Sequence, residues 1–101
     1  MKHAFRTMLL AALFGAAMQA SAQSWPTKPV KLIVSQAAGG APDIVARLVS
    51  DRLSRIWGQQ VIVDNRPGSG NVIGAQLAAR SAPDGYTLFF ATAAALVTHP
   101  Y

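Results

Sequence analysis

The 101-residue sequence contains no cysteine and no glutamate, and its only acidic side chains are four aspartates. Without cysteine, the chain has no disulfide and no cysteine that could carry a lipid after a signal peptide. The four aspartates form no pair at the spacing of metal ligands or of a general acid and base. The sequence therefore predicts no catalytic residue, no metal site and no cofactor.

No apolar run approaches the roughly 20 residues that an α-helix needs to cross a bilayer. The longest one, Met8–Met18, follows two basic residues and precedes an Ala-Ser-Ala site that ends at Ala22. This order is typical of a secretory signal peptide, and the shortness of the run disfavours the alternative of a retained membrane anchor. Residues 1–22 are therefore predicted to be cleaved after Ala22, and the protein to be exported to the periplasm.

Beyond residue 22, seven basic residues face four aspartates, so the positive charge is smaller than the +5 of the whole sequence. These basic residues stand singly, with no basic run and no interleaved aromatic residues. Surfaces that bind nucleic acids typically show such clustering. We therefore expect no nucleic-acid partner.

Strand and helix signals alternate along residues 23–101. Apolar runs at 30–34, 61–64 and 86–91 predict three short strands. Apolar residues at helical spacing predict a helix over 43–57, and a segment rich in small residues predicts another over 71–82. The order β-α-β-α-β is typical of an α/β fold with a parallel sheet.

A parallel sheet with right-handed crossovers places every strand-to-helix loop at one edge. If the strand order is 2-1-3, as in doubly wound folds, a crevice opens between the loops that follow the first and third strands. These loops are Ser35–Asp43 and the segment from Ala91 onward. We expect the binding site between them.

The loop SQAAGGAPD, Ser35–Asp43, leads from the first strand into the first helix. Gly39 and Gly40 would let backbone N–H groups approach an anion at the helix start, although a turn alone also favours glycine. Asp43 is interpreted first as a charge in the first helical turn and second as a ligand contact. Neither loop contains Arg or Lys, so an anion would be held by backbone groups, a helix end and water.

The segment GSGNVIG, Gly68–Gly74, is close to the dinucleotide-binding fingerprint. However, it follows the second strand, and its third glycine comes one residue late. A tight turn followed by a close-packed helix is the preferred interpretation. The alternative function is a secreted nucleotide-dependent enzyme that uses this turn.

Three motifs that follow the signal peptide together resemble the Bug-type substrate-binding proteins of tripartite tricarboxylate transporters: KPVKLIV with its Gly-Gly loop, VDNRPGSGNVIGA, and APDGYTL. The resemblance implies a two-lobed, type 2 periplasmic binding-protein fold, which closes on a small organic carboxylate and delivers it to membrane permease subunits. Family members are much longer. Residues 23–101 are therefore expected to be a partial amino-terminal lobe that does not make a working receptor alone.

Position by position, the resemblance implies a first ligand loop at Ser35–Asp43 and a second that starts at Thr92. The candidate ligand-binding residues are Ser35, Ala38, Gly39, Gly40, Asp43, Thr92 and Ala94. The family often has proline at position 35, where this chain has serine. It also has hydroxyl residues at position 41 and around positions 94 and 95, where this chain has alanine. Thr92 is thus the clearest side-chain donor of the second loop. Either backbone and water do more of the binding, or the ligand is less polar.

Overall fold

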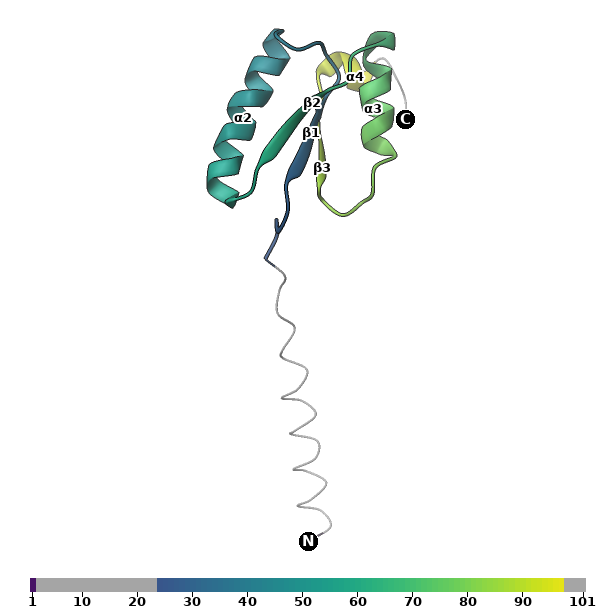
Figure 1. The fold of residues 1–101 in the computed structure, drawn as a ribbon. Coiled ribbons are helices and arrows are strands. Elements are labelled where there is room, and N and C mark those ends of the chain that lie inside the picture. The colour runs from purple at the N-terminus through teal and green to yellow at the C-terminus, as the bar shows by residue number, and fades with distance from the viewer. Residues whose placement is uncertain (2–23, 98–101) are drawn as a thin grey trace.

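The computed structural model describes residue 1 and residues 24–97, so the predicted signal peptide lies outside the described residues (Figure 1). The elements in chain order are β1 (Val30–Val34), α2 (Ala41–Trp57), β2 (Val61–Asn65), the 3-10 turn η1 (Ser69–Asn71), α3 (Val72–Ala79), β3 (Thr87–Phe90) and α4 (Ala93–Val97). Among these described elements, no helix has the length and apolar character needed to span a membrane.

The three strands form one parallel sheet in the order β2-β1-β3. Val34 of the central strand pairs with Asn65 on one side and with Phe90 on the other. The strands all run in the same direction, but β2 is added on one side of β1 and β3 on the other, so the strand order reverses between β1 and β3. The predicted α/β class, the parallel sheet and the strand order are confirmed.

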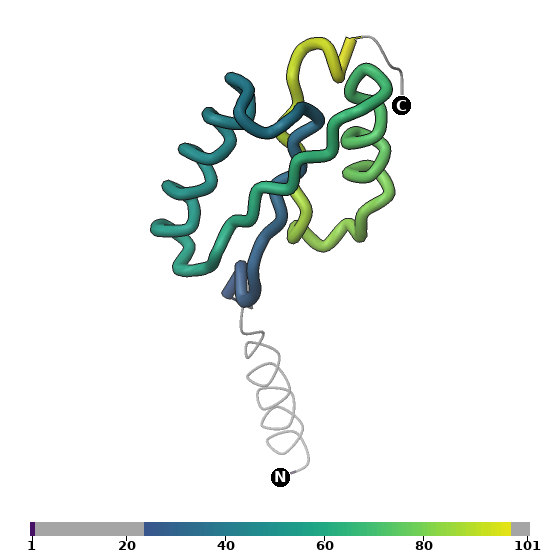
Figure 2. Tube along the Cα trace, turned by 45° about the horizontal axis from the view of Figure 1, so that its top comes forward, coloured from purple at the N-terminus to yellow at the C-terminus, as the bar shows by residue number. Residues whose placement is uncertain are grey.

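Helices cover both faces of the central strand, α2 on one side and α3 on the other (Figures 1 and 2). Val30, Leu32 and Val34 form the core together with Ala46 of α2 and Val61 of β2. Ile33, which points to the opposite face by strand alternation, is buried as well. Burial on both faces explains why β1 is almost continuously apolar.

Helix α2 begins two residues before its predicted start. Gly40 is the N-cap in an extended conformation, and Pro42 lies in the first turn, where the missing N–H of proline breaks no helical hydrogen bond. The helix ends at Gly58, which adopts the left-handed conformation (φ 66°) of a typical C-terminal cap. Near this end, Val61 N donates to Ser54 Oγ at 2.9 Å and connects the helix to β2.

Helix α3 ends at Ala79, three residues before its predicted end. It lies very close to the sheet, because a Cβ atom at Gly74 would come within 2.9 Å of Ser35 Cα and 3.0 Å of the Arg66 carbonyl oxygen. Only glycine permits this approach. The close packing expected from the small residues of this segment is confirmed.

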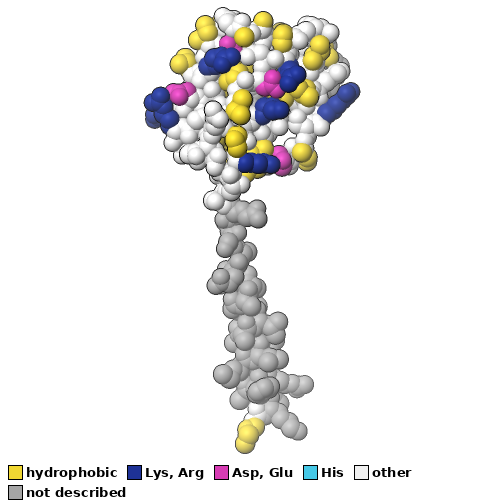
Figure 3. All heavy atoms as spheres, in the orientation of Figure 1, with side chains coloured by type: hydrophobic (Ala, Val, Ile, Leu, Met, Phe, Trp, Pro, Cys, Tyr) yellow, Lys and Arg dark blue, Asp and Glu magenta, His cyan; other side chains and the backbone are white. Residues whose placement is uncertain are grey.

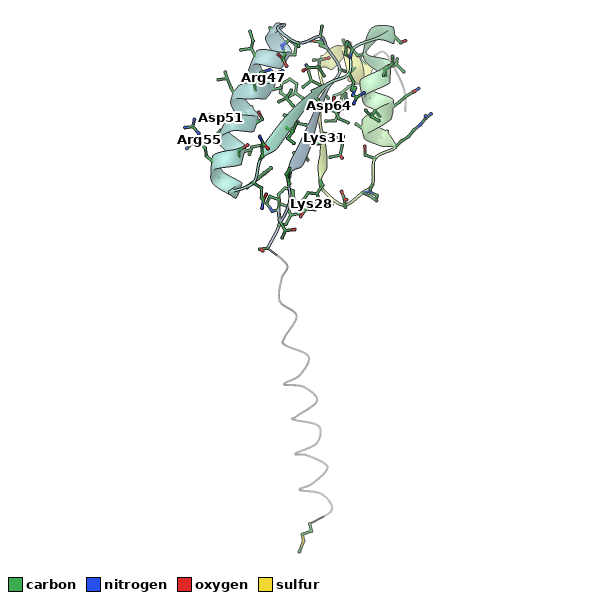
Figure 4. All side chains as sticks on the ribbon, in the orientation of Figure 1. Lys28, Lys31, Arg47, Asp51, Arg55 and Asp64 are labelled. Atoms are coloured by element: carbon green, nitrogen blue, oxygen red, sulfur yellow. The ribbon has the colours of Figure 1, made fainter. Side chains whose placement is uncertain are left out.

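Aromatic residues close the amino edge of the sheet, where Figure 4 labels Lys28. The Trp25 and Trp57 rings meet edge to face with their centroids 4.8 Å apart, and the Tyr86 ring lies 6.0 Å from Trp25. Thr27 N donates to the Tyr86 hydroxyl at 3.0 Å, and Lys28 Nζ lies 4.5 Å from the centroid of the Tyr86 ring. Hydrogen bonds with the side chain and backbone of Thr27 lower the pKa of Tyr86. We call Trp25, Trp57 and Tyr86 the amino-edge cluster.

Candidate ligand-binding site

The carboxyl ends of β1 and β3 lie side by side at the edge of the sheet drawn uppermost in Figure 1. Because Val34 pairs with Phe90, Ser35 and Ala91 leave the sheet next to each other. The chain then turns from Ser35 into α2, and from Ala91 into α4. The structure thus brings together the two loops from which the candidate residues were chosen.

Two buried hydroxyl groups at this edge have no hydrogen-bond partner within the described part of the chain: Ser35 Oγ and Thr92 Oγ1. Ser35 is only 1 % exposed. An unsatisfied buried polar group costs about 1–3 kcal/mol, so native proteins usually provide it with a protein, water or ligand partner. Both residues belong to the candidate set.

Backbone donors stand beside these hydroxyls at the start of α2. The N-cap residue, Gly40, provides no side-chain hydrogen bond to the first N–H groups of the helix. The N–H groups of Ala38 and Ala41 donate to no other residue of the described chain. Free N–H groups and the positive end of the helix dipole both favour an anion at this position.

Charged side chains are dispersed over the face drawn in Figure 3, with basic and acidic groups next to one another. Several of them form ion pairs, such as Arg66 with Asp64 at 2.9 Å and Arg55 with Asp51 at 2.8 Å. Any attraction for an anion at the carboxyl edge therefore depends on local donors and not on a basic patch.

The two adjacent glycines of the first loop have different roles. Gly39 has φ 90°, a region that side-chain-bearing residues rarely adopt, and its N–H already donates to Asp43 Oδ2 at 2.9 Å. Gly40 has φ −76°, and a Cβ added there would make only ordinary contacts, the nearest 3.6 Å from the Ala37 carbonyl oxygen. The turn itself requires Gly39, whereas at Gly40 only a closely approaching ligand would require glycine.

Asp43 lies in the first turn of α2 and is 3 % exposed. Its Oδ2 accepts hydrogen bonds from Arg47 Nε and Gly39 N, and its Oδ1 accepts one from Asn65 Nδ2, each at 2.9 Å. These bonds, with that from Arg47 first, lower the pKa of Asp43 from 3.8 to about 2. They support the interpretation of Asp43 as a first-turn charge over direct ligand contact.

Asn65 and Arg47 were not among the predicted site residues. Asn65 Nδ2 donates to the Gln36 carbonyl oxygen at 3.1 Å as well as to Asp43, and so connects the end of β2 to the first loop. Its position at the carboxyl end of the second strand was the available signal, because every parallel strand ends at this edge. Arg47 follows Asp43 by one helical turn, a spacing at which side chains meet.

The second loop is helical, which the sequence analysis did not anticipate. The Thr92 carbonyl oxygen accepts hydrogen bonds from Ala95 N at 3.0 Å and Leu96 N at 3.3 Å and so starts α4. The run AAALV carried the signal, because alanine has the highest helix propensity. Ala94 is exposed on this short helix, and residues 98–101 lie outside the described part.

The segment Gly68–Gly74 forms a turn and the start of α3. Gly68 and Gly70 have positive φ angles of 129° and 62°, and Gly74 is the point of contact between α3 and Ser35. Turn formation and packing therefore account for all three glycines, as the preferred interpretation of this motif predicts.

Residues 45–101 match the family described as the tripartite tricarboxylate transporter family receptor. The chain belongs to this family. A UPF0065 protein of Bordetella bronchiseptica is 50 % identical over 97 residues, which cover 94 % of this chain and 29 % of that protein. The chain thus spans less than a third of the length of this curated relative. Members of the family are described as receptors, which supports the expectation that the chain is not an enzyme.

Solved structures show the same relationship. The chain is similar to the periplasmic binding protein BugD (40 % identity, TM-score 0.62). It is also similar to two Rhodopseudomonas palustris proteins. One was solved with adipate (43 % identity, TM-score 0.63), and the other is MatC with bound malate (37 % identity, TM-score 0.62). Each match covers 64 % of this chain and 22 % of the solved chain. The fold assignment is therefore confirmed at the level of the periplasmic binding-protein family.

Proposed function

We propose that residues 23–101 form part of the amino-terminal lobe of a periplasmic receptor that captures a small organic carboxylate for a tripartite transporter. In this proposal residues 1–22 are the cleaved signal peptide, and the receptor delivers its ligand to membrane permease subunits. Similar proteins were solved with adipate and with malate. Both ligands are carboxylates. Because the two loops of this chain carry no basic side chain, hydroxyl and backbone N–H donors would hold such a carboxylate.

The observation that carries this proposal is the pair of unpartnered buried hydroxyls, Ser35 Oγ and Thr92 Oγ1. They come from the two loops at the point where the strand order reverses, which is where α/β proteins bind ligands. A carboxylate oxygen accepts hydrogen bonds from hydroxyl and N–H donors alike. The N-terminus of α2 adds donors and a favourable field.

These groups together do not account for tight binding. Micromolar affinity requires about 8 kcal/mol. A hydrogen bond to a charged group contributes about 1.5–3 kcal/mol, and a helix end typically adds about 0.3–1 kcal/mol. Two hydroxyl bonds and one helix end therefore leave a deficit, which enclosure by a second lobe would supply. We expect residues 23–101 alone to bind carboxylates weakly.

The test is a chimera in which residues 24–97 replace the matching segment of the adipate-bound Rhodopseudomonas palustris protein. Calorimetric titration with adipate, malate, citrate, NAD and ATP should give micromolar binding of at least one carboxylate and none of either nucleotide. Ser35→Ala and Thr92→Val should each weaken binding about tenfold or more. Ser81→Ala, which removes a hydroxyl bonded to the Leu77 carbonyl oxygen at the other end of α3, is the matched control.

Unchanged carboxylate affinity in both the Ser35 and Thr92 variants would contradict this assignment of the site. Titration of the complete chain should give binding at least 100-fold weaker than that of the chimera. Mass spectrometry of the chain recovered from the periplasm should show a start at Gln23. Recovery with residues 1–22 attached would contradict the proposed cleavage.

A further inference from the structure

A closed ring of hydrogen bonds joins α2, β2 and the first loop beside the candidate site. Arg47 Nε donates to Asp43 Oδ2 at 2.9 Å, and Asn65 Nδ2 donates to Asp43 Oδ1 at 2.9 Å. Arg47 Nη2 completes the ring by donating to Asn65 Oδ1 at 3.3 Å. The loop is attached at two points, through the Gln36 carbonyl oxygen and through Gly39 N.

The shape of this loop depends on a carboxylate at position 43. Asp43 accepts hydrogen bonds on both oxygens from three different donors. An asparagine would present an amino group to one of these donors, because its amide has only one acceptor atom. The ring therefore requires the carboxylate in its ionised form.

The same carboxylate places a negative charge next to a site proposed for an anion. The Asp43 side chain is 4 % exposed, so water screens its charge poorly. An uncompensated carboxylate in the first turn of α2 would oppose the helix N-terminus and repel the ligand. At effective dielectric constants typical of such sites, the repulsion would weaken binding about tenfold or more.

Arg47 resolves this conflict by its position. Its guanidinium forms an ion pair with Asp43 at 2.9 Å, and its side chain is 56 % exposed, whereas that of Asp43 is buried. Figure 4 shows Arg47 near the upper end of α2, whereas the Asp51–Arg55 ion pair of the same helix lies lower down and faces outward. Of the two ion pairs of α2, only Asp43–Arg47 lies next to the ligand loop.

We propose that Arg47 is a specificity-determining positioning residue, which neutralises the buried Asp43 carboxylate so that the first loop can keep its shape and still accept an anion. This inference rests on the proposed carboxylate-binding function. Arg47 acts through Asp43 and does not contact the ligand. The residue that gives the site its preference for anions thus lies outside both ligand loops.

The experiment is a titration of the chimeric receptor with adipate and malate for the parent, four variants of the ring and one control variant. Arg47→Met should weaken binding of the preferred ligand about tenfold or more. Arg47→Lys keeps the charge but gives up the forked contact with Asp43 and Asn65, so it should lose clearly less affinity than Arg47→Met. Asp43→Asn removes the repelling charge but gives up one of the three hydrogen bonds that the carboxylate accepts, so it should lose some affinity, though less than Arg47→Met. The double variant Asp43→Asn/Arg47→Met should recover most of the loss caused by Arg47→Met.

A purely structural role makes the opposite prediction for the double variant. If Arg47 only supported the fold, removal of both partners would be at least as harmful as removal of Arg47 alone. Arg55→Met, which breaks the exposed Asp51–Arg55 pair at the same helical spacing, is the matched control and should change affinity less than twofold. Circular dichroism and urea unfolding of each variant confirm that the compared proteins are folded.

The outcomes separate this inference from the function on which it rests. Parent affinity in Arg47→Met, or a double variant as weak as Arg47→Met, overturns the role of Arg47 and leaves carboxylate binding intact. An Arg47→Lys protein that is folded but binds as weakly as Arg47→Met also overturns it, because charge would then not be the property that matters. A parent chimera that binds no carboxylate overturns the proposed function and this inference together.

Discussion

At the amino edge of the sheet, Trp25, Trp57 and Tyr86 pack against one another, and the Tyr86 hydroxyl has partners from Thr27. At the carboxyl edge, about one strand length away, the hydroxyl of Ser35 is buried without a partner. The first arrangement is complete within the described chain. The second contains hydroxyl groups that no residue of the described chain satisfies.

This comparison indicates that the molecule separates stability from binding along the strand direction. Aromatic burial at the amino edge contributes favourable free energy of folding. Unsatisfied donors at the carboxyl edge reduce that free energy, and in the proposed function a ligand accepts their hydrogen bonds. Changes at the two edges should therefore have different effects on unfolding and on affinity, and the following variants of the chimera test this separation.

The largest loss of stability is expected from Trp57→Ala in the amino-edge cluster. Replacing a buried tryptophan by alanine typically costs 3–5 kcal/mol, and since Trp57 is only partly buried we expect about 3 kcal/mol in urea unfolding followed by circular dichroism. Carboxylate affinity should stay within twofold. A parallel loss of affinity in the folded protein would show that the two edges are coupled.

Gly74→Ala should affect both properties, because this position connects α3 to the carboxyl edge. The new Cβ would lie 2.9 Å from Ser35 Cα, and overpacking of this kind costs about 1–3 kcal/mol. The displacement of Ser35 should also weaken carboxylate binding about tenfold. Ala79→Gly, at an exposed position of the same helix, should destabilise by about 1 kcal/mol without any change in affinity.

Substitutions of the two loop glycines should have different effects: at Gly39 on the free energy of folding, and at Gly40 on carboxylate affinity. Gly39→Ala forces a side chain into a conformation with φ 90° and should cost about 1–2 kcal/mol of folding free energy. Gly40→Val meets no positive φ, but valine is unfavourable at an N-cap, so we expect a loss of about 0.5–1 kcal/mol. It should nevertheless weaken carboxylate binding strongly, because a branched side chain would block the backbone. Unchanged affinity in Gly40→Val would show that the ligand does not approach the loop there.

Acid should remove the stabilisation that the hydrogen-bonded carboxylate of Asp43 contributes. The pKa of Asp43 is about 2 in the folded chain against an ordinary value of 3.8, so the unfolded state binds a proton first. The stabilisation is therefore complete above about pH 4 and declines as the pH falls towards 2. Urea midpoints measured from pH 5 to 2.5 should decrease less steeply in Asp43→Asn than in the parent. Equal slopes would contradict the assigned hydrogen bonds.

The strands could be predicted because their signals are local. Val30–Val34 has the predicted bounds, since an apolar run between turn residues defines a buried strand. Helix ends were less predictable. α2 starts at Ala41 because Pro42 fits a first turn. α3 ends early because Ser81 N donates to the Ala78 carbonyl oxygen, three residues back, while the Ser81 hydroxyl donates to the Leu77 carbonyl oxygen.

The site could be predicted only at the level of loops. Topology alone places the ends of β1 and β3 together, whereas the choice of Ser35 and Thr92 within these loops came from the family resemblance. That their hydroxyls are both buried and unpartnered depends on tertiary packing, above all on the approach of α3 at Gly74. The contact of Asn65 with Asp43 joins residues 22 positions apart, and no local pattern indicates it.

The position of the aromatic rings has a practical consequence for optical measurements on this chain. Trp25 and Trp57 are its only tryptophans, and both belong to the amino-edge cluster. Because indole fluorescence reports the immediate surroundings of the ring, native emission should follow unfolding and remain unchanged when a ligand arrives at the other edge. A tryptophan introduced at Gln36 in a Trp25→Phe/Trp57→Phe background would reverse this sensitivity. The position of the fluorophore thus decides whether this lobe reports its own unfolding or, within the chimera, the binding of a carboxylate.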